Sequence, residues 1–183
     1  MDRWVGVLVA VVIVAIAAWL MVRSWKRRTK RDETMSAYPL PSAHSEPILE
    51  TEVLYVATTP VGQPIERLAV QGLAFRGAAH LEVRREGVVL RIAGEAANFI
   101  PADRISAAGE ASYAIDRAVE PEGLVAISWI VRVDDPERVA PFVDSYLRAR
   151  YPGDTARIIG AVNDIAAARI APRPEQESEA SDD

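Results

Sequence analysis

Hydrophobic and polar positions divide the 183-residue chain into unequal parts. An unbroken apolar run occupies residues 4–22, close to the N-terminus. Residues 51–171 alternate instead between short apolar stretches and turn-forming residues, and residues 172–183 are almost entirely polar. The pattern predicts a membrane-type segment, one folded domain and a solvated tail.

The apolar run has the length and composition of a helix that crosses a membrane. Its nineteen residues (WVGVLVAVVIVAIAAWLMV) contain no charged side chain. At a rise of 1.5 Å per residue the helix is roughly 28 Å long, close to the hydrocarbon thickness of a bilayer. Residues 1–22 are therefore predicted to be a transmembrane anchor, with Trp4, Trp19 and Trp25 at its boundaries. A cleaved signal peptide is the alternative, since Ala15–Ala17 offers a small-residue cleavage pattern, but the run continues past that site.

Charge around the apolar run predicts its orientation. Only Arg3 and the amino group precede it, whereas six basic side chains follow it directly. Positive residues stay on the cytoplasmic side, so the domain is predicted to face the cytoplasm from a single-pass position in the plasma membrane. The cluster could also attract anionic lipids, although every anchor of this orientation carries one. Its members are Arg23, Lys26, Arg27, Arg28, Lys30 and Arg31.

Small residues within the anchor bear on helix pairing. Gly6 and Ala10 have the spacing that lets two helices approach closely, and Ala17 lies roughly on the same face. Because alanine is common in such helices, this pattern is only a weak indication of a homodimer.

Two polar segments flank the domain. Residues 23–50 join the basic cluster to a proline-containing stretch without apolar periodicity, and they are predicted to form a juxtamembrane linker. Residues 172–183 carry five acidic residues and one arginine, which is typical of a disordered tail. The tail contains no specific binding motif.

Runs of β-branched and aromatic residues, separated by turn residues, predict a small antiparallel sheet or barrel in residues 51–171. Gly87 separates two runs and predicts a hairpin whose turn needs positive φ. Gly109 is a candidate bulge position. The expected strands are Glu52–Thr58, Ala79–Arg84, Val88–Ala93, Asn98–Ile100, Arg104–Tyr113, Leu124–Val133 and Phe142–Leu147.

The expected strand Leu124–Val133 has one wholly apolar face, on which Trp129 holds the middle position. Trp129 is therefore expected to be buried between this strand and a C-terminal helix. That helix is predicted to begin with Asp154 as its cap, after Pro152-Gly153. Its apolar stripe contains Ile158, Val162, Ile165 and Ala166.

The segment Pro64–Phe75 is predicted to form a short helix packed on the barrel. Ile65, Leu68, Ala69 and Leu73 would then share one face. A partner-binding element is the alternative interpretation.

The residues that carry chemistry argue against catalysis. The chain has no cysteine, no glycine-rich phosphate loop and no nucleophile elbow. His44 falls in the linker, and His80 is a lone histidine on a strand. Asp134-Asp135 could bind a cation, but adjacent acids before a proline more often form a turn. We therefore predict no enzyme activity, no cofactor and no metal site.

Several segments resemble a known family. LYVATTPVGQPIERLAVQGLAFRGAAHLEV, GVVLRIAG, NFIPADRI and EGLVAISW look like the bacterial pleckstrin-homology (PH)-like domain of actinobacterial single-pass membrane proteins, often labelled transporter or export proteins. The similarity runs over roughly residues 52–170, and the anchor matches the family arrangement. It implies a mainly β fold, in which a bent antiparallel barrel of about seven strands is capped by a C-terminal α-helix. It implies no catalytic or ligand residues.

Some eukaryotic PH-like domains bind phosphoinositides through basic residues between their first two strands. Here the corresponding segment offers only Arg67 and Arg76, separated by apolar residues. Residues 51–171 contain thirteen arginines, no lysine and sixteen acidic residues. Neither strong phosphoinositide binding nor nucleic-acid binding is therefore expected.

The sequence favours a membrane-anchored binding or scaffold module, whose partner is a protein of unknown identity. The alternative is an accessory subunit of a membrane transport or export complex. One apolar helix without polar residues cannot by itself form a substrate pathway. The scaffold interpretation is accordingly preferred.

Overall fold

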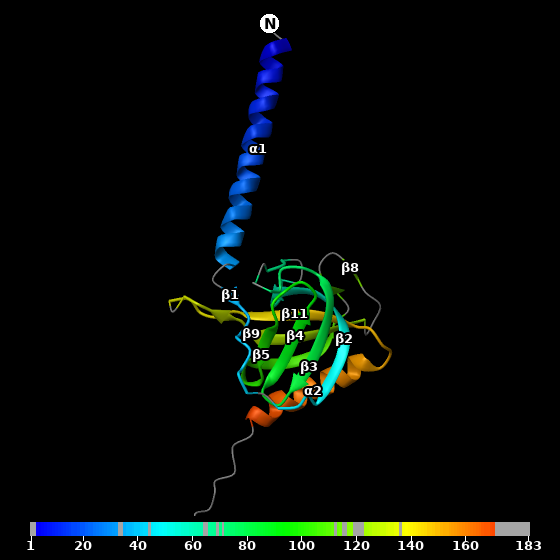
Figure 1. The fold of residues 1–183 in the computed structure, drawn as a ribbon. Helices are drawn as coiled ribbons and strands as arrows, with labels where there is room; N and C mark the ends of the chain where they lie inside the picture. The colour runs from blue at the N-terminus through cyan, green and yellow to red at the C-terminus, as the bar shows by residue number, and fades with distance from the viewer. Residues whose placement is uncertain are drawn as a thin grey trace, which may run out of the picture.

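The computed structural model describes residues 3–32, 35–43, 45–63, 66–68, 70, 72–111, 113–114, 117–118, 123–135 and 137–170. A long N-terminal helix precedes a β-barrel, and a second helix lies across the end of that barrel (Figure 1). The elements are α1 (Arg3–Asp32), β1 (Met35–Ser36), β2 (Leu49–Pro60), β3 (Gly77–Arg84), β4 (Gly87–Ile92), β5 (Asn98–Pro101), the 3-10 turn η1 (Ala102–Arg104), β6 (Ile105–Ala111), β7 (Tyr113–Ala114), β8 (Arg117–Ala118), β9 (Leu124–Ile130), β10 (Arg132–Val133), β11 (Phe142–Ala149) and α2 (Asp154–Ile170).

Seven strands form one sheet in the order β5-β4-β3-β2-β11-β9-β6. Every neighbouring pair in this order is antiparallel. The sheet bends around a single core, with α2 packed mainly on β6 and η1 (Figure 1). This architecture confirms the predicted mainly β fold, in which seven strands are followed by a C-terminal helix.

Most strand bounds shift by one to three residues from the predicted ranges, and two predicted features of the strands are wrong. The strand predicted at Leu124–Val133 is split at Val131, because β10 pairs with β1 in a separate small sheet. The bulge predicted at Gly109 is wrong, since Gly109 pairs regularly with Ala126. A side chain at position 109 would meet open space, so no close approach requires glycine there.

The face of β9 that was predicted to be apolar is the buried face. Ile127 is 1% exposed and Trp129 is completely buried. Trp129 shares one core cluster with Ile158 of α2. Its ring also lies 6.5 Å from the ring of Tyr38, which precedes β2. The indole therefore packs against the segment that contains Tyr38, in addition to the predicted strand and helix.

A chain of hydrogen bonds runs through the core beside this indole. The Tyr55 hydroxyl donates to the Leu73 carbonyl oxygen at 2.7 Å, so it accepts from the Thr58 hydroxyl at 2.9 Å. Thr58 in turn accepts from Ser145 at 2.8 Å, and Ser145 accepts from Trp129 Nε1 at 2.9 Å. Each of the four side-chain donors in this series of hydrogen bonds thus has an acceptor. Burial raises the pKa of Tyr55 to about 12, which keeps its hydroxyl protonated.

The β3–β4 hairpin turns at the predicted glycine. Gly87 has φ of 154°, outside the range that other residues favour. A Cβ at this position would lie 2.2 Å from the carbonyl oxygen of Ile100 and 2.9 Å from Cα of Pro101. Glycine is therefore required both by the turn and by the close approach of β5.

The segment between β2 and β3 does not form the predicted helix in its described residues. Leu68, Val70 and Leu73 are nevertheless buried in the core. The carbonyl oxygens of Gly72 and Leu73 accept hydrogen bonds from the side chains of Asn98 and Tyr55, which stabilise a non-helical path. Ile65 and Ala69, which were expected on the helical face, lie outside the described residues.

The described residues 35–43 and 45–48, which we call the strap, are folded onto the barrel, although they were predicted to be part of a linker. Met35 is 4% exposed and pairs with Val133. The Tyr38 amide donates to the Phe99 carbonyl at 3.1 Å, and its hydroxyl donates to the Ile130 carbonyl at 3.2 Å. A few anchoring side chains suffice because the strap packs on an existing core. The domain therefore begins near Met35 and not at residue 51.

The carbonyl oxygen of Gly153 accepts the Arg157 amide at 3.4 Å, which makes Gly153 the cap of α2. Asp154, which was predicted to be the cap, is instead the first residue of α2. Its carboxylate accepts a hydrogen bond from the Thr51 hydroxyl at 2.5 Å and another from the Arg157 guanidinium at 2.8 Å. The carboxylate thus ties the start of α2 to β2.

A second polar contact joins the middle of α2 to the edge of the sheet. The Ala108 amide donates to Asn163 Oδ1 at 2.8 Å, and Asn163 Nδ2 donates to the Ala108 carbonyl at 2.9 Å. β6 is the last strand of the sheet order, so Asn163 satisfies backbone groups that no strand satisfies.

Replacing Asn163 with alanine is expected to lower the free energy of unfolding by about 1–3 kcal/mol, because two half-buried backbone groups lose their partners. Urea denaturation of the variant measures this loss. Asp164→Ala, at an exposed position of the same helix, is the matched control. Equal midpoints for the two variants would contradict the prediction.

Candidate membrane anchor and binding groove

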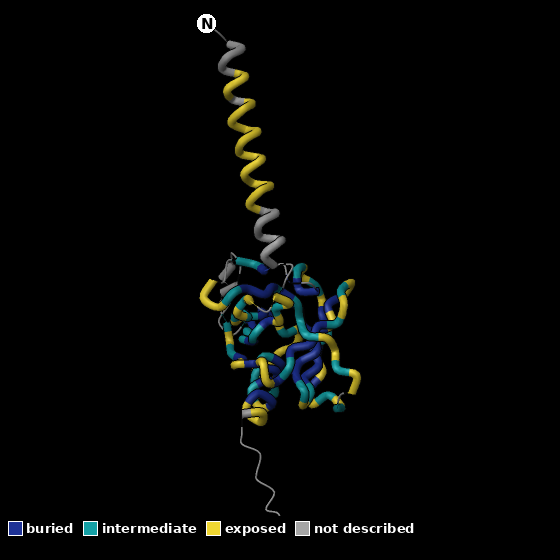
Figure 2. The backbone as a smooth tube through the Cα atoms, turned by 90° about the vertical axis from the view of Figure 1, so that its left-hand side faces the viewer, coloured by how far each residue is buried: buried dark blue, intermediate teal, exposed yellow. Residues whose placement is uncertain are grey.

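The apolar face that the sequence assigns to a membrane is fully exposed. The part of the chain that the structure describes has one helix long and apolar enough to cross a membrane, with a span at Val7–Ser24 and mean hydropathy of 2.5. None of this span is buried against the domain, as Figure 2 shows along α1. An apolar surface of this size requires cover from a membrane or a partner.

The predicted boundary tryptophans and the basic cluster lie on one continuous helix, since α1 extends to Asp32 and not only to residue 22. Trp19 is exposed, and the Arg23 guanidinium lies 5.6 Å from the centre of its ring. This cation–π contact suits the boundary between acyl chains and headgroups. The remaining members have side chains outside the described part of the structure, namely Trp4, Trp25, Lys26, Arg27, Arg28, Lys30 and Arg31.

The domain is attached closely to the end of α1. The helix ends at Asp32, and β1 begins at Met35. Three residue steps span at most about 11 Å. Residues 23–50 were predicted to separate the domain from the membrane as a linker. They do not, because residues 23–32 are part of α1 and most of the later residues pack on the barrel.

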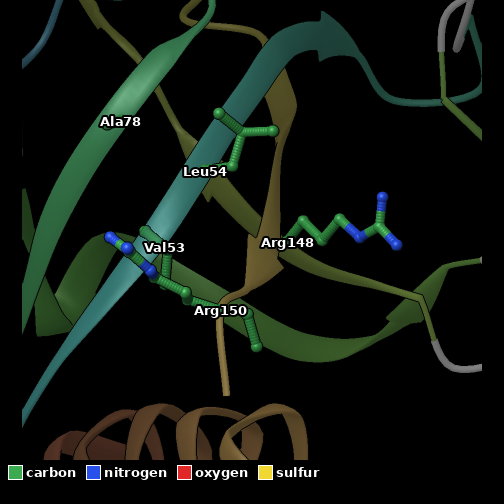
Figure 3. A pocket seen from close by; sticks show the side chains of 6 residues that line it. Val53, Leu54, Ala78, Arg148 and Arg150 are labelled. Carbon is green, nitrogen blue, oxygen red and sulfur yellow. The ribbon is translucent and has the colours of Figure 1, made fainter. Parts of the chain in front are cut away.

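A surface groove of about 430 Å³ lies where β2, β3 and β11 meet (Figure 3). Ala78 stands opposite Leu54 in the register of β2 and β3, and its small side chain leaves the surface hollow. A neighbouring hollow of about 330 Å³ shares Val53, Ala78 and Arg150. The groove is lined by Val53, Leu54, Ala78, Arg148, Ala149 and Arg150.

The two arginines of the groove differ in their partners. Arg150 donates to the Glu52 carboxylate at 2.6 Å. Arg148 is exposed and enters none of the ion pairs found among the described residues. Figure 3 shows the two guanidinium groups directed away from each other, with Leu54 on the side of Arg148. The groove thus offers an apolar floor and one guanidinium that is available to a carboxylate.

A buried carboxylate lies on the outer side of β3, beyond this groove. Glu82 is 6% exposed and accepts hydrogen bonds from Arg84 at 2.6 Å and from Arg91 at 3.0 Å. Burial alone would raise the pKa of Glu82, but the hydrogen bonds and charges of the two arginines outweigh burial and lower it. The sequence does not indicate this cluster, because Glu82 occupies a position that alternation assigns to solvent.

Because its pKa is lowered on folding, Glu82 contributes stability that is present above its unfolded pKa of about 4.5 and is lost as the pH falls through the folded pKa. Glu82→Gln is therefore expected to lower the free energy of unfolding by about 1–3 kcal/mol at neutral pH. The variant should also lose less stability than the unaltered protein when the pH is lowered from neutral to acidic, because it lacks this titrating carboxylate. Denaturation midpoints between neutral and acidic pH test this. Parallel curves for the two proteins would show that Glu82 is not the titrating group.

The other candidate residues are not brought together. His80 is partly exposed on β3, 3.9 Å from the Glu50 carboxylate. The Asp135 carboxylate accepts the Glu137 amide at 3.0 Å, as in a turn. Among the described residues, no group of three or more histidine, aspartate or glutamate side chains could hold a metal ion. His44 lies outside the described residues.

The arginines considered for anion binding have separate roles. Arg67 donates to the carbonyl of Val56 at 2.7 Å, where the pairing of β2 with β11 shifts register. Arg76 is exposed, and Arg91 bonds to Glu82. The use of Arg67 on a bulge carbonyl could not be inferred from the sequence, since the bulge depends on pairing with β11.

The sequence profile of a family described as "Bacterial PH domain-like" matches residues 34–163. No curated protein matches the chain in sequence. Among solved structures, a chain of "The 8S snRNP Assembly Intermediate" is similar with a TM-score of 0.48 and 10% identity, covering 81% of this chain and 98% of that one. The family match begins within one residue of β1, in agreement with a domain that includes the strap.

Proposed function

Because the chain belongs to the bacterial PH domain-like family, we propose that it is a membrane-anchored binding module whose domain faces the cytoplasm and holds a protein partner. α1 anchors the domain, and the attachment at Met35 keeps it at the membrane surface. Anchoring raises the local concentration of the domain for any partner at the same membrane. No step of this function requires catalysis.

The groove beside Arg148 carries this proposal. Its apolar floor suits an extended peptide, and the guanidinium of Arg148 suits an acidic side chain on that peptide. Neighbouring charges are already paired, as in the Arg150–Glu52 and Arg91–Glu82 contacts. Arg148 therefore confers the charge preference of the groove.

Site-specific photo-crosslinking in the full-length membrane protein tests the groove. A photoreactive residue in place of exposed Ala78 is expected to capture a protein, and the same residue at exposed Ala156 on α2 is not. Arg148→Glu should lower the yield at position 78 about tenfold or more, the loss expected for an interfacial charge contact. Arg85→Glu makes the same charge change at an exposed turn and is the control. Equal capture at both positions, or capture of lipid alone, would refute the proposal.

Orientation is tested separately. An enzyme reporter that is active only outside the cytoplasm, fused to the C-terminus, is expected to remain inactive. Neutralising Arg27, Arg28, Lys30 and Arg31 together should release activity in part of the population. An active reporter on the unaltered protein would place the domain on the opposite side.

The identity of the captured protein separates the two candidate functions. A transport or export protein would favour an accessory-subunit role, and a soluble protein would favour a scaffold. The span Val7–Ser24 is apolar as far as Val22, and its polar residues, Arg23 and Ser24, lie at its end, so any substrate pathway would belong to the partner.

A further inference from the structure

The hollow of about 330 Å³ beside the groove is lined by groups that favour an anion. It extends over β2, β3 and β4, and its charged or titratable lining residues are Glu52, His80, Arg91 and Arg150. His80 and Arg91 stand opposite each other in the register of β3 and β4. Glu50 lies 3.9 Å from His80 but is not among the lining residues. The hollow thus has two guanidinium groups and one carboxylate.

One of these guanidinium groups belongs to a cluster with an excess of positive charge. Arg84 and Arg91 share a single carboxylate, that of Glu82, at 2.6 Å and 3.0 Å. Because one carboxylate neutralises only one guanidinium, the cluster keeps a positive charge. The side chain of Arg84 is 11% exposed and that of Arg91 is 46% exposed. The excess charge therefore faces solvent at Arg91, in the hollow.

The tail, residues 172–183, has the opposite charge. It lies outside the described residues, so we infer its place from its charge, its length and the point at which α2 ends. Its only basic residue is Arg173. Its acidic residues are Glu175, Glu177, Glu179, Asp182 and Asp183.

The end of α2, from which the tail continues, lies near the turn between β3 and β4. Burial acts to raise the pKa of Glu86 in this turn, but hydrogen bonds from its own amide and from Ser45, together with the charge of Arg169, lower it. The charges of Arg169 and Glu86 therefore lie within about 10 Å, the range over which salt does not screen them. The Ala102 amide of η1 donates to the Glu86 carbonyl at 2.8 Å, in agreement with the packing of α2 on η1.

The tail is long enough to reach the hollow from this point. Between the Cα atoms of Arg169 and Glu86, the two side chains add at most about 11 Å to the separation of about 10 Å between their charges. Five residue steps along β4 separate Glu86 from Arg91, at most about 17 Å. The sum is about 38 Å, whereas fourteen residue steps from Arg169 to Asp183 extend to about 46 Å. The last acidic residues therefore reach Arg91 even when each separation is at its maximum.

We propose that the acidic tail binds in the hollow beside Arg91 and His80 and thereby covers part of the groove. The hollow and the groove share Val53, Ala78 and Arg150, so a segment bound in the hollow lies over the Ala78 side of the groove. The tail and an acidic partner segment then compete for one surface. This competition rests on the proposed function, whereas the binding of the tail does not.

Tethering makes a weak contact sufficient. A short flexible segment presents its acidic side chains to the hollow at about millimolar effective concentration. Exposed ion pairs are individually weak, so a partner that adds apolar contacts can displace the tail. The basic cluster of α1 is a competing site for the tail, but α1 meets the domain on the side opposite α2 (Figure 1). The hollow is therefore expected to be preferred.

Intramolecular crosslinking in the full-length protein tests the contact. The chain has no cysteine, so Ser181→Cys in the tail is combined with Ala93→Cys, at an exposed position that lines the hollow. The protein is held in nanodiscs with one copy each and is treated with a short bismaleimide. This pair is expected to crosslink about fivefold faster than a control pair, the ratio available from one exposed ion pair.

The control pair joins Ser181→Cys to Ala156→Cys. Ala156 is exposed on α2, at about 20 Å from Arg169 along the helix, so a freely moving tail reaches it easily. Neutralising the tail should bring the two rates together, and so should high salt. The neutral tail carries Glu175→Gln, Glu177→Gln, Glu179→Gln, Asp182→Asn and Asp183→Asn.

Three outcomes would overturn the contact. These are equal rates at positions 93 and 156, a rate at 93 that the neutral tail leaves unchanged, and faster crosslinking to Thr29→Cys, which would show that the tail pairs with the basic cluster of α1.

The effect on the groove is measured separately, by photo-crosslinking at position 78 with and without residues 172–183. Removing the tail should raise the capture of the partner about fivefold. Unchanged capture would contradict the competition. No capture with either protein would contradict the proposed function and leave the tail contact in place.

Discussion

Replacing Trp129 with alanine is expected to lower the free energy of unfolding of the domain by about 3–5 kcal/mol, which approaches the whole stability of an ordinary domain. The indole is completely buried, and the variant leaves a cavity beside Tyr38 and β11. It also removes the donor at the start of the buried hydrogen-bond chain. Chemical denaturation of a fragment spanning residues 35–171 measures the loss.

Trp129→Phe separates the two contributions. Phenylalanine retains most of the ring packing but donates no hydrogen bond to Ser145, which keeps its bond to Thr58. We expect a loss clearly smaller than that of alanine. Val139→Ala, at a position that is 89% exposed, should leave the fragment unchanged. A Trp129→Ala fragment that keeps its melting temperature would show that the inward face of β9 is wrongly identified.

A fragment that begins at residue 51 is expected to be less stable than one that begins at residue 35 by about 3–6 kcal/mol, because it loses the buried side chains of Met35 and Leu49. It also loses the contacts of Tyr38 and the first two residues of β2. On the scale of domain stability, such a fragment would be largely unfolded or would aggregate. Urea denaturation and amide exchange of fragments 35–171 and 51–171 test this.

Met35→Ala in the longer fragment is the intermediate comparison. It is expected to show part of the loss, because it removes one buried side chain but leaves the strap paired. Ala43→Ser, at an exposed strap position, is the control. Fragments 35–171 and 51–171 of equal stability would mean that the strap contributes nothing to the fold.

The local sequence pattern predicted the structure correctly where a residue's conformation or burial depends on its own strand, turn or helix. The alternation that runs through Trp129 predicted the buried face of β9, since successive strand residues point to opposite sides. Gly87 was predictable because its turn requires a conformation that glycine favours. The helix starting at Asp154 was predictable from its apolar spacing. The close approach of Ile100 to Gly87 was not, because it comes from a distant strand.

The sequence was insufficient where distant segments determine the structure. Leu68 and Leu73 belong to a set of four apolar residues with helical spacing, but hydrogen bonds from β2 and β5 hold their segment in another path. The strap has no periodicity of its own, and Met35 acquires its partner only when β10 leaves the main sheet. The groove beside Arg148 likewise depends on the register that sets Ala78 against Leu54. Such features follow from tertiary pairing, which a single strand's pattern does not encode.

The pairing of Asn163 with Ala108 has a consequence for self-association. An unpaired strand edge can template the addition of another strand, which leads to domain swapping and fibrils. At the β6 edge, Asn163 occupies the amide and carbonyl that an incoming strand would need. At the β5 edge, Tyr38 occupies the carbonyl of Phe99. These two contacts therefore hinder edge-to-edge association between molecules, which crowding on a membrane would favour under the proposed anchoring.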